Sequence, residues 1–213
     1  MLFNPTKIAM IQDIPGIGLR ESYRQILQEF KPNIIAFAEY FLVGPKYTNT
    51  ASAVEHRVAH LNQIKAWSIE FNCLIGGGTI VDTENGHKFN RCYLVDKGEI
   101  LGHYDKIHLY RNEGSGQITP GHDYRIFQWR NFRLGLLICA DVLYPESFQA
   151  MRELKPDLIF IPTTSPYKPA ETTDEKFARD NNVFVGGAAE TGAILVKVAP
   201  QAILSAIRCR EEA

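Results

Sequence analysis

The sequence lacks the long apolar run that a membrane-spanning helix needs. None of its hydrophobic segments approaches the required length of roughly 18–20 residues. The first residues, MLFNP, also lack the basic and apolar regions of a secretory signal peptide. We therefore expect an intracellular, cytoplasmic protein with no membrane partner.

An excess of charge of one sign is also missing. The 213 residues carry 23 lysines and arginines against 24 aspartates and glutamates, so the formal net charge is −1. Acids and bases are interspersed, which argues against a basic face for nucleic acid and against an acidic tail. No stretch rich in proline, glycine, serine or charge divides the chain, and its length suffices for one sizeable core. We predict a single domain over residues 1–213 that does not bind nucleic acid.

Cysteines are few and widely scattered. The chain has four of them, and no two share the C-x-x-C spacing of a zinc site. Such a set argues against a disulfide framework, so we interpret all four as reduced thiols. They are Cys73, Cys92, Cys139 and Cys209.

Three motifs that would bind a metal or a nucleotide are incomplete. His56 and His60 have the spacing of a metal pair on a helix, but the glutamate of the metalloprotease motif is missing between them. Residues 16–18 (GIG) lack the third glycine of a dinucleotide fingerprint and an acid at the right distance. The glycines at 76–78 lack the lysine of a phosphate loop, which favours a bulge or a close backbone contact instead. The sequence predicts no metal and no cofactor.

Short apolar runs alternate with helical patterns along the chain, which is typical of α/β proteins. The expected strands are residues 7–12, 34–38, 72–81, 89–95, 99–104, 125–129, 132–138, 157–161, 183–189 and 194–198. The expected helices are residues 23–30, 50–71, 146–154, 174–181 and 201–212.

The segment 132–146, FRLGLLICADVLYPE, contains the most informative cysteine. Its apolar run fits a strand covered on both faces, and this run ends at Cys139. Pro145 and Glu146 then begin a helix, since proline suits the first turn and acids favour its positive end. A thiol between a buried strand and a helix lies where α/β proteins place their chemistry. The alternative is that Cys139 is a small buried hydrophobe, which is the commoner fate of a cysteine.

Two charged side chains also follow apolar strands directly. Glu39 comes after residues 34–38, where burial disfavours the charged carboxylate and suits it to carry a proton; the alternative is a cap of the next loop. Lys106 comes just after residues 99–104, where it can supply a fixed positive charge to an oxyanion. The alternative for Lys106 is a surface lysine with a buried stem.

Other side chains are weaker candidates for the same site. Residues 111–121 form a loop long enough to contact a ligand, and the role of its Glu113 stays ambiguous. Four further side chains either line a pocket or pack as ordinary aromatic or polar surface. They are Tyr40, Tyr144, Tyr167 and His108.

The order of Glu39, Lys106 and Cys139 resembles that of the nitrilase (carbon–nitrogen hydrolase) superfamily. The matching motifs are FAEY for the glutamate, YDKIHLY for the lysine and GLLICADVLYPE for the cysteine. NRCYLVDKGEI, TPGH and FARDNNVFVGGAAETG add support, so the resemblance covers nearly the whole chain. It implies an α/β fold, a four-layer α-β-β-α sandwich of two mixed β-sheets flanked by helices, with the site at one end of the strands.

The resemblance also implies a reaction on a small amide without a cofactor. Glu39 would accept the thiol proton so that Cys139 attacks the carbonyl carbon. Lys106 and the backbone N–H of Ala140 would hold the oxyanion. The amine would leave with the proton, and water activated by the same glutamate would cleave the thioester. Glu113 would match the family's second glutamate, which orients the lysine or the substrate.

Two departures from the family pattern affect assembly and pocket shape. The chain is short after Gly192, which puts the usual tail-mediated dimer in doubt and leaves a homodimer through the helix after Cys139 open. Ala140 stands where many relatives carry a larger residue, and Glu146 matches an acid that is more architectural than chemical.

The same residues leave alternative functions open. Nitrile hydrolysis and acyl transfer would use the same nucleophile, base and oxyanion charge. A catalytically silent binding protein or a thiol sensor on this fold would use Cys139 for oxidation instead. An amide is the expected substrate, and its identity is not readable from the sequence.

Overall fold

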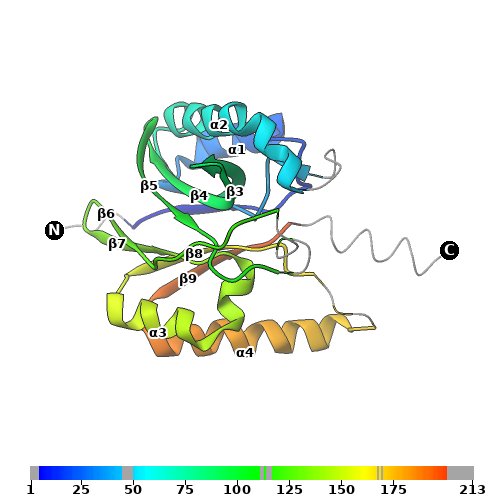
Figure 1. Ribbon diagram of the computed structural model, residues 1–213. Helices are drawn as coiled ribbons and strands as arrows, with labels where there is room; N and C mark the ends of the chain where they lie inside the picture. The colour runs from blue at the N-terminus through cyan, green and yellow to red at the C-terminus, as the bar shows by residue number, and fades with distance from the viewer. Residues whose placement is uncertain are drawn as a thin grey trace.

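The computed structural model of the chain describes residues 5–44, 50–110, 113, 117–166, 168 and 170–200. Two β-sheets pack face to face, and a pair of helices covers the outer face of each (Figure 1). The predicted four-layer α-β-β-α sandwich is confirmed. The expected helix at 201–212, Cys209 and Tyr167 lie outside the described residues. No helix within the described ranges combines the length and the apolar character of a membrane span.

The first sheet contains five strands in chain order. They are β1 (Ile8–Ile11), β2 (Ile34–Phe37), β3 (Leu74–Glu84), β4 (His87–Asp96) and β5 (Glu99–Asp105). The first three run parallel, whereas β3, β4 and β5 pair antiparallel, so the sheet is mixed. Asn85-Gly86 and Lys97-Gly98 connect the antiparallel strands, and all four residues have the positive φ that type I′ turns require.

The glycines at 76–78 explain a bend in β3. The register of β3 against β4 shifts between Gly76 and Thr79, and Gly78 has a φ of +78°. A Cβ on Gly76 would lie 3.0 Å from the ring of Phe160 in the other sheet. The predicted bulge is therefore confirmed, and the close contact is with Phe160 of the other sheet.

The second sheet contains four strands and is also mixed. They are β6 (Ile126–Trp129), β7 (Phe132–Leu136), β8 (Leu158–Pro162) and β9 (Ile194–Val198). β6 pairs antiparallel with β7, and β7, β8 and β9 run parallel. β8 is buried along its whole length, since Leu158 and Phe160 face the other sheet and Ile159 and Ile161 face the helices. Both faces are covered, so the strand reads as a continuous apolar run.

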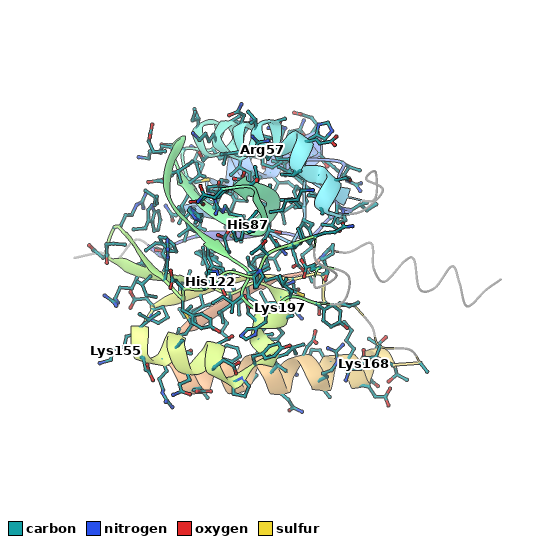
Figure 2. The ribbon with its side chains drawn as sticks, viewed as in Figure 1. Arg57, His87, His122, Lys155, Lys168 and Lys197 are labelled. Carbon is teal, nitrogen blue, oxygen red and sulfur yellow. The ribbon has the colours of Figure 1, made fainter. Side chains whose placement is uncertain are left out.

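Four α-helices form the outer layers. α1 (Glu21–Phe30) and α2 (Arg57–Glu70) cover the first sheet, and α3 (Pro145–Leu154) and α4 (Thr173–Thr191) cover the second (Figure 1). Leu27, Ile64 and Trp67 join the core on the first side, and Phe148 and Met151 join it on the other. Charged side chains occupy the outer surface, as Arg57 and Lys155 illustrate (Figure 2).

Two secondary-structure predictions, one of a helix and one of a strand, need correction. The helix expected at 50–71 is a 3-10 helix, η2 (Thr50–His56), followed by α2, because His56 leaves the α region with φ −104° and ψ 8°. The strand expected at 183–189 is wrong, since α4 continues through it to Gly192, which caps the helix with a φ of +68°. A capping box of Thr172 and Glu175 starts this helix. The small residues at 186–188 mislead because the buried one, Gly187, allows close packing of α4 on Phe148 of α3 rather than pairing in a sheet.

Candidate functional site

Three strand ends place the predicted site residues together. Glu39 follows β2, Lys106 follows β5 and Cys139 follows β7. The Nζ atom of Lys106 lies 2.8 Å from Oε1 of Glu39, and both side chains are buried. Thr164 links this pair to the cysteine: its N–H donates to Oε2 of Glu39 at 3.1 Å, and its Oγ1 lies 3.6 Å from Sγ of Cys139. A buried carboxylate, a buried ammonium and a half-buried cysteine thus meet at one site.

Lys106 lies between two carboxylates. Its Nζ atom is 2.6 Å from Oε2 of Glu113 in addition to its contact with Glu39. Asn90 donates from Nδ2 to Oε1 of Glu39 at 2.9 Å and to Oε1 of Glu113 at 2.8 Å. Burial acts to lower the pKa of Lys106, but the two carboxylates outweigh it and raise the pKa above its usual value. The side chain is therefore a fixed ammonium.

Glu113, whose role stayed ambiguous in the sequence, contacts the lysine directly. Burial acts to raise the pKa of Glu113, yet Lys106 and the hydroxyl of Tyr40 hold it below its usual value. The Tyr40 hydroxyl donates to Oε1 of Glu113 at 2.5 Å. Burial raises the pKa of Tyr40 well above the usual value, so it remains a neutral donor. Tyr40 and Glu113 hold the ammonium in place.

Cys139 lies on a strained turn between β7 and the 3-10 helix η4 (Cys139–Leu143). Its φ of +45° falls in the left-handed region, which a non-glycine residue adopts at a cost that functional sites often bear. Burial and the charge of Glu39 raise the pKa of the Cys139 thiol, Lys106 and Thr164 oppose the rise, and the resulting pKa is about 11. At neutral pH the side chain is a thiol, so it needs a base before it can act as a nucleophile.

A buried aspartate to which the sequence pattern assigned no role holds this turn. Oδ2 of Asp141 accepts bonds from the N–H of Ile138 and the hydroxyl of Tyr104, both at 2.8 Å. Oδ1 accepts from the N–H of His108 at 2.8 Å. One carboxylate therefore ties the Cys139 turn to the segment after β5. The position of Asp141, two residues after Cys139, is the sequence feature that could have pointed to this role.

Two other contacts were missed as well. Asn90 belongs to the motif NRCYLVDKGEI but had no role assigned, and Thr164 lies in the loop after β8. Their contacts with Glu39 join parts of the chain that are far apart in the sequence, by 51 and 125 residues. Local patterns carry no information on such pairs.

Tyr144 and His108 do not line the cavity beside Cys139. Their rings stack on each other with centroids 3.8 Å apart and planes 7° apart. Nε2 of His108 lies 3.1 Å from the hydroxyl of Tyr124, and 3.7 Å from the exposed carboxylate of Glu146. This stack joins the segment after Lys106 to the start of α3, away from the cavity.

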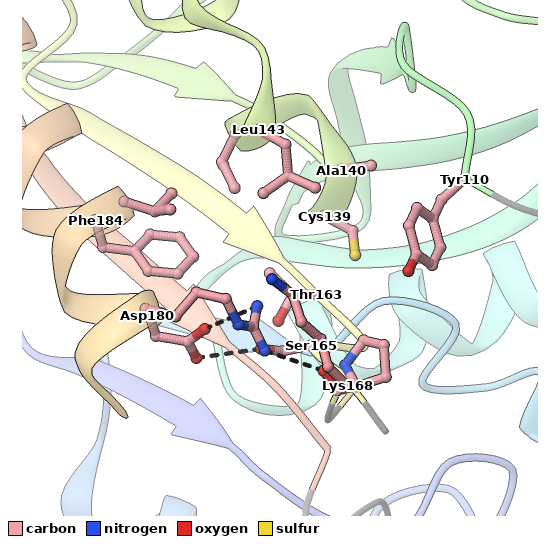
Figure 3. A pocket seen from close by; sticks show the side chains of 13 residues that line it. Tyr110, Cys139, Ala140, Leu143, Thr163, Ser165, Lys168, Asp180 and Phe184 are labelled. Atoms are coloured by element: carbon pink, nitrogen blue, oxygen red, sulfur yellow. Dashed lines mark hydrogen bonds and ion pairs between the residues drawn. The ribbon is translucent and has the colours of Figure 1, made fainter. Parts of the chain in front are cut away.

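A cavity of about 190 Å³ opens beside the sulfur. Figure 3 shows the sulfur of Cys139 directed into it, with Tyr110 on one side and Phe184 across from it. Most of the wall is apolar, and Ala140 lies in it next to the sulfur. The charged part of the wall consists of Lys168, Arg179 and Asp180. A small ligand with an apolar body fits this space.

A second hollow of about 290 Å³ is lined by the end of β3, the start of β4 and the end of β5, and by His87 and His122, which Figure 2 labels. Two of its acids, Glu84 and Asp105, are already paired with the buried guanidinium of Arg91. Across the described ranges, histidine, cysteine, aspartate and glutamate side chains form no group of three that could hold a metal ion. The three cysteines in those ranges carry reduced thiols.

Comparison with known proteins adds sequence evidence. The family model described as carbon–nitrogen hydrolase matches residues 18–207. The omega-amidase YafV of Escherichia coli is 30% identical over 129 residues, which cover 60% of this chain and 50% of that protein. The glutamine-dependent NAD(+) synthetase of Acinetobacter baylyi is 24% identical over 178 residues, which cover 76% of this chain and 32% of that protein. The chain thus spans half or less of the length of these two curated relatives.

Solved structures of two other proteins have a fold similar to that of this chain. An amidase from Nesterenkonia sp. AN1 has a TM-score of 0.77 at 19% identity, over 92% of this chain and 79% of that one. That structure is of a glutamate mutant and shows the result of Michael addition of acrylamide at the active-site cysteine. A carbon–nitrogen hydrolase from Helicobacter pylori has a TM-score of 0.76 at 18% identity, over 90% of this chain and 72% of that one.

Proposed function

Because this chain belongs to the carbon–nitrogen hydrolase family, we propose that it hydrolyses the amide bond of a small molecule through a thioester on Cys139. The observation that carries the proposal is the buried ammonium of Lys106, held by Glu39 and Glu113, with Thr164 connecting Glu39 to the sulfur that faces the cavity. This arrangement supplies a base, a fixed positive charge and a nucleophile within one small space.

The first step is proton transfer from Cys139 to Glu39. With a pKa of about 11, the thiol keeps its proton at neutral pH, so attack requires a carboxylate that takes the proton as the new bond forms. The S–H bond breaks, an O–H bond forms on Glu39, and the sulfur electron pair attacks the carbonyl carbon of the amide.

Attack moves the carbonyl electron pair onto oxygen. The ammonium of Lys106 stabilises this oxyanion together with the backbone N–H of Ala140, which lies in the first turn of η4, where N–H groups lack intrahelical partners. The C–N bond then breaks, and Glu39 returns its proton to the leaving amine or ammonia. Glu113 and Tyr40 keep the ammonium in position throughout.

The second half of the reaction releases the acid. Water loses a proton to Glu39 and attacks the thioester carbon, again with the oxyanion held by Lys106. The C–S bond breaks, the carboxylic acid leaves, and Cys139 regains a proton from Glu39. The net reaction is amide plus water to acid plus amine, with no cofactor.

The wall of the cavity favours a small acyl group. Its volume of about 190 Å³ and its mostly apolar wall fit a short aliphatic chain next to the reacting carbonyl. One relative is named an omega-amidase and another a glutamine-dependent synthetase. Glutamine and the monoamides of short dicarboxylic acids therefore belong in the first set of substrates tested.

The test is ammonia release from a panel of short amides, with the matching nitriles alongside. We expect release from one or more amides, and loss of release in Cys139→Ala and in Glu39→Gln. Added hydroxylamine captures the acyl group of the thioester as a hydroxamate, which reports the acyl-enzyme, and release of the acid without it identifies hydrolysis rather than transfer. Turnover retained in Cys139→Ala would exclude the proposed nucleophile.

A thiol sensor is the less favoured alternative. Sensor cysteines are exposed and have a low pKa, because the thiolate is the form that oxidises. Burial and a neighbouring carboxylate instead raise the pKa of Cys139 to about 11. This environment suits a nucleophile that is activated only when a base takes its proton.

A further inference from the structure

Thr164 contacts both members of the proposed acid–base pair. It lies just beyond β8, and its backbone N–H donates to Oε2 of Glu39 at 3.1 Å. Its side-chain hydroxyl oxygen lies 3.6 Å from Sγ of Cys139. One residue therefore fixes the separation between the base and the sulfur.

The donors around Glu39 are unevenly shared between its two oxygens. Oε1 accepts from Nζ of Lys106 at 2.8 Å and from Nδ2 of Asn90 at 2.9 Å. Oε2 accepts from the N–H of Thr164. A carboxylate oxygen has two lone-pair sites, so these two donors fill Oε1, whereas Oε2 accepts one bond, from the residue whose hydroxyl contacts the thiol. Oε2 is therefore the oxygen suited to take the proton.

The sulfur needs a donor of its own as it loses that proton. Burial removes the water that would otherwise solvate a thiolate, and the nearby carboxylate disfavours the negative charge further. Lys106 and the hydrogen bonds from Thr164 act in the opposite direction and favour the thiolate. A hydrogen bond to a charged acceptor is stronger than one to a neutral acceptor, so a hydroxyl beside the sulfur helps most when the charge develops.

We propose that Thr164 is a further catalytic residue, whose N–H fixes Oε2 of Glu39 as the proton acceptor and whose hydroxyl donates a hydrogen bond to the sulfur of Cys139. The thiol proton moves to Oε2, and the sulfur electron pair forms the bond to the carbonyl carbon. Thr164 keeps its own proton, so no further reactant is needed. This inference rests on the proposed function for the identity of the nucleophile and the base.

Three substitutions separate the hydroxyl from the backbone contact. Thr164→Val keeps the shape and the N–H but removes the hydroxyl, and Thr164→Ala removes it without branching at Cβ. Thr164→Ser restores the hydroxyl. The matched control is Thr83→Val, which removes a threonine hydroxyl that donates to the carbonyl oxygen of His87 at 2.9 Å in the β3–β4 hairpin. Circular dichroism confirms that each variant is folded.

The measurement is the rate of alkylation of Cys139 by iodoacetamide, followed on its own peptide by mass spectrometry from about pH 6.5 to about pH 9.5. Since the thiolate is the reacting form, a pKa raised by about one unit slows alkylation about tenfold at each pH below the pKa. We expect this slowing in Thr164→Val and Thr164→Ala. We expect Thr164→Ser within about threefold of the parent protein and Thr83→Val unchanged.

Alkylation needs no turnover, so this test stays separate from the proposed hydrolysis. Equal alkylation rates in the parent protein and in both hydroxyl-less variants overturn the inference even if amides are hydrolysed. Slowing by the same factor in Thr83→Val overturns it too. Where a hydrolysed amide is known, kcat falls about tenfold in Thr164→Val while KM stays within about twofold, because the hydroxyl contacts the sulfur rather than the substrate body.

Discussion

The ammonium of Lys106 lies 2.8 Å from Oε1 of Glu39, and the two side chains are only 1% and 2% exposed. A buried ion pair of this kind gains little net stability, because both charges leave water to form it. It does fix geometry, since Lys106 cannot move without leaving the carboxylates of Glu39 and Glu113 without their ion pair. The pair thus keeps the proposed base and the proposed oxyanion donor in fixed positions relative to each other.

Breaking this pair from one side has a large expected cost. Lys106→Met leaves two carboxylates buried against each other, and we expect a loss of about 3–5 kcal/mol in the free energy of unfolding. Adding Glu39→Gln to Lys106→Met removes one of those charges and recovers part of the loss. Urea unfolding of both variants measures the difference. Equal stability of the single and double variants would show that the two charges are not coupled.

Loss of the Glu113 carboxylate has a smaller expected effect than loss of Lys106. Glu113→Gln keeps the shape but removes one of the charges that raise the pKa of Lys106, so the ammonium is held less firmly. We expect kcat to fall about tenfold with the fold intact, since ligand-orienting contacts of this kind cost one to two orders of magnitude. The matched control is Glu99→Gln at the exposed start of β5, which leaves kcat unchanged. A kcat equal in both variants contradicts the assigned role.

The pKa of Cys139 makes a prediction for stability at alkaline pH. The folded thiol has a pKa of about 11, above its unfolded value of about 8.5–9, so the unfolded state loses its proton first as the pH rises. This contribution destabilises the folded protein by roughly 1–2 kcal/mol between about pH 8 and about pH 10. Cys139→Ala lacks it. The free energy of unfolding of the parent protein should therefore fall relative to Cys139→Ala over this range, and a constant difference between the two argues against a raised pKa.

Alanine substitutions at two adjacent glycines test how α4 packs on α3. A Cβ on Gly187 would lie 2.3 Å from the ring of Phe148 on α3, whereas a Cβ on Gly186 meets nothing within 4 Å. Gly186→Ala should stabilise the protein by about 0.5–1 kcal/mol through helix propensity. Gly187→Ala should destabilise it by about 1–3 kcal/mol through overpacking. Thermal unfolding distinguishes them, and effects of the same sign would contradict this packing of α4 on α3.

Much of the fold could be predicted because its signals are local. A strand such as β8, covered on both faces, reads as an unbroken apolar run, and the polar residue that ends such a run marks a sheet edge. For the same reason, Glu39, Lys106 and Cys139 could be identified from their positions after apolar runs in the sequence. The apolar and small residues at 183–189 were wrongly predicted as a strand, since they belong to α4 and the buried Gly187 packs on the ring of Phe148 rather than on a neighbouring strand.

The residues that orient the site could not be found this way. Thr164 and Asp141 act through contacts between the two sheets, and Asn90 acts through a contact between two strands that are not neighbours in the first sheet. A sequence pattern does not reveal which distant atoms meet. Glu113 stayed ambiguous for the same reason. Glu113 lies seven residues after Lys106, and no helical or strand periodicity in the sequence predicts that the two side chains meet.

The most direct test of the account is the mass of the protein during turnover. An amide that releases ammonia is mixed with the protein, the reaction is stopped with acid, and the intact mass and the Cys139 peptide are measured. The account predicts a mass increase equal to the acyl group on Cys139, lost on treatment with hydroxylamine and absent in Cys139→Ala. Ammonia release by Cys139→Ala at the parent rate, or an acyl group on another residue, would contradict it.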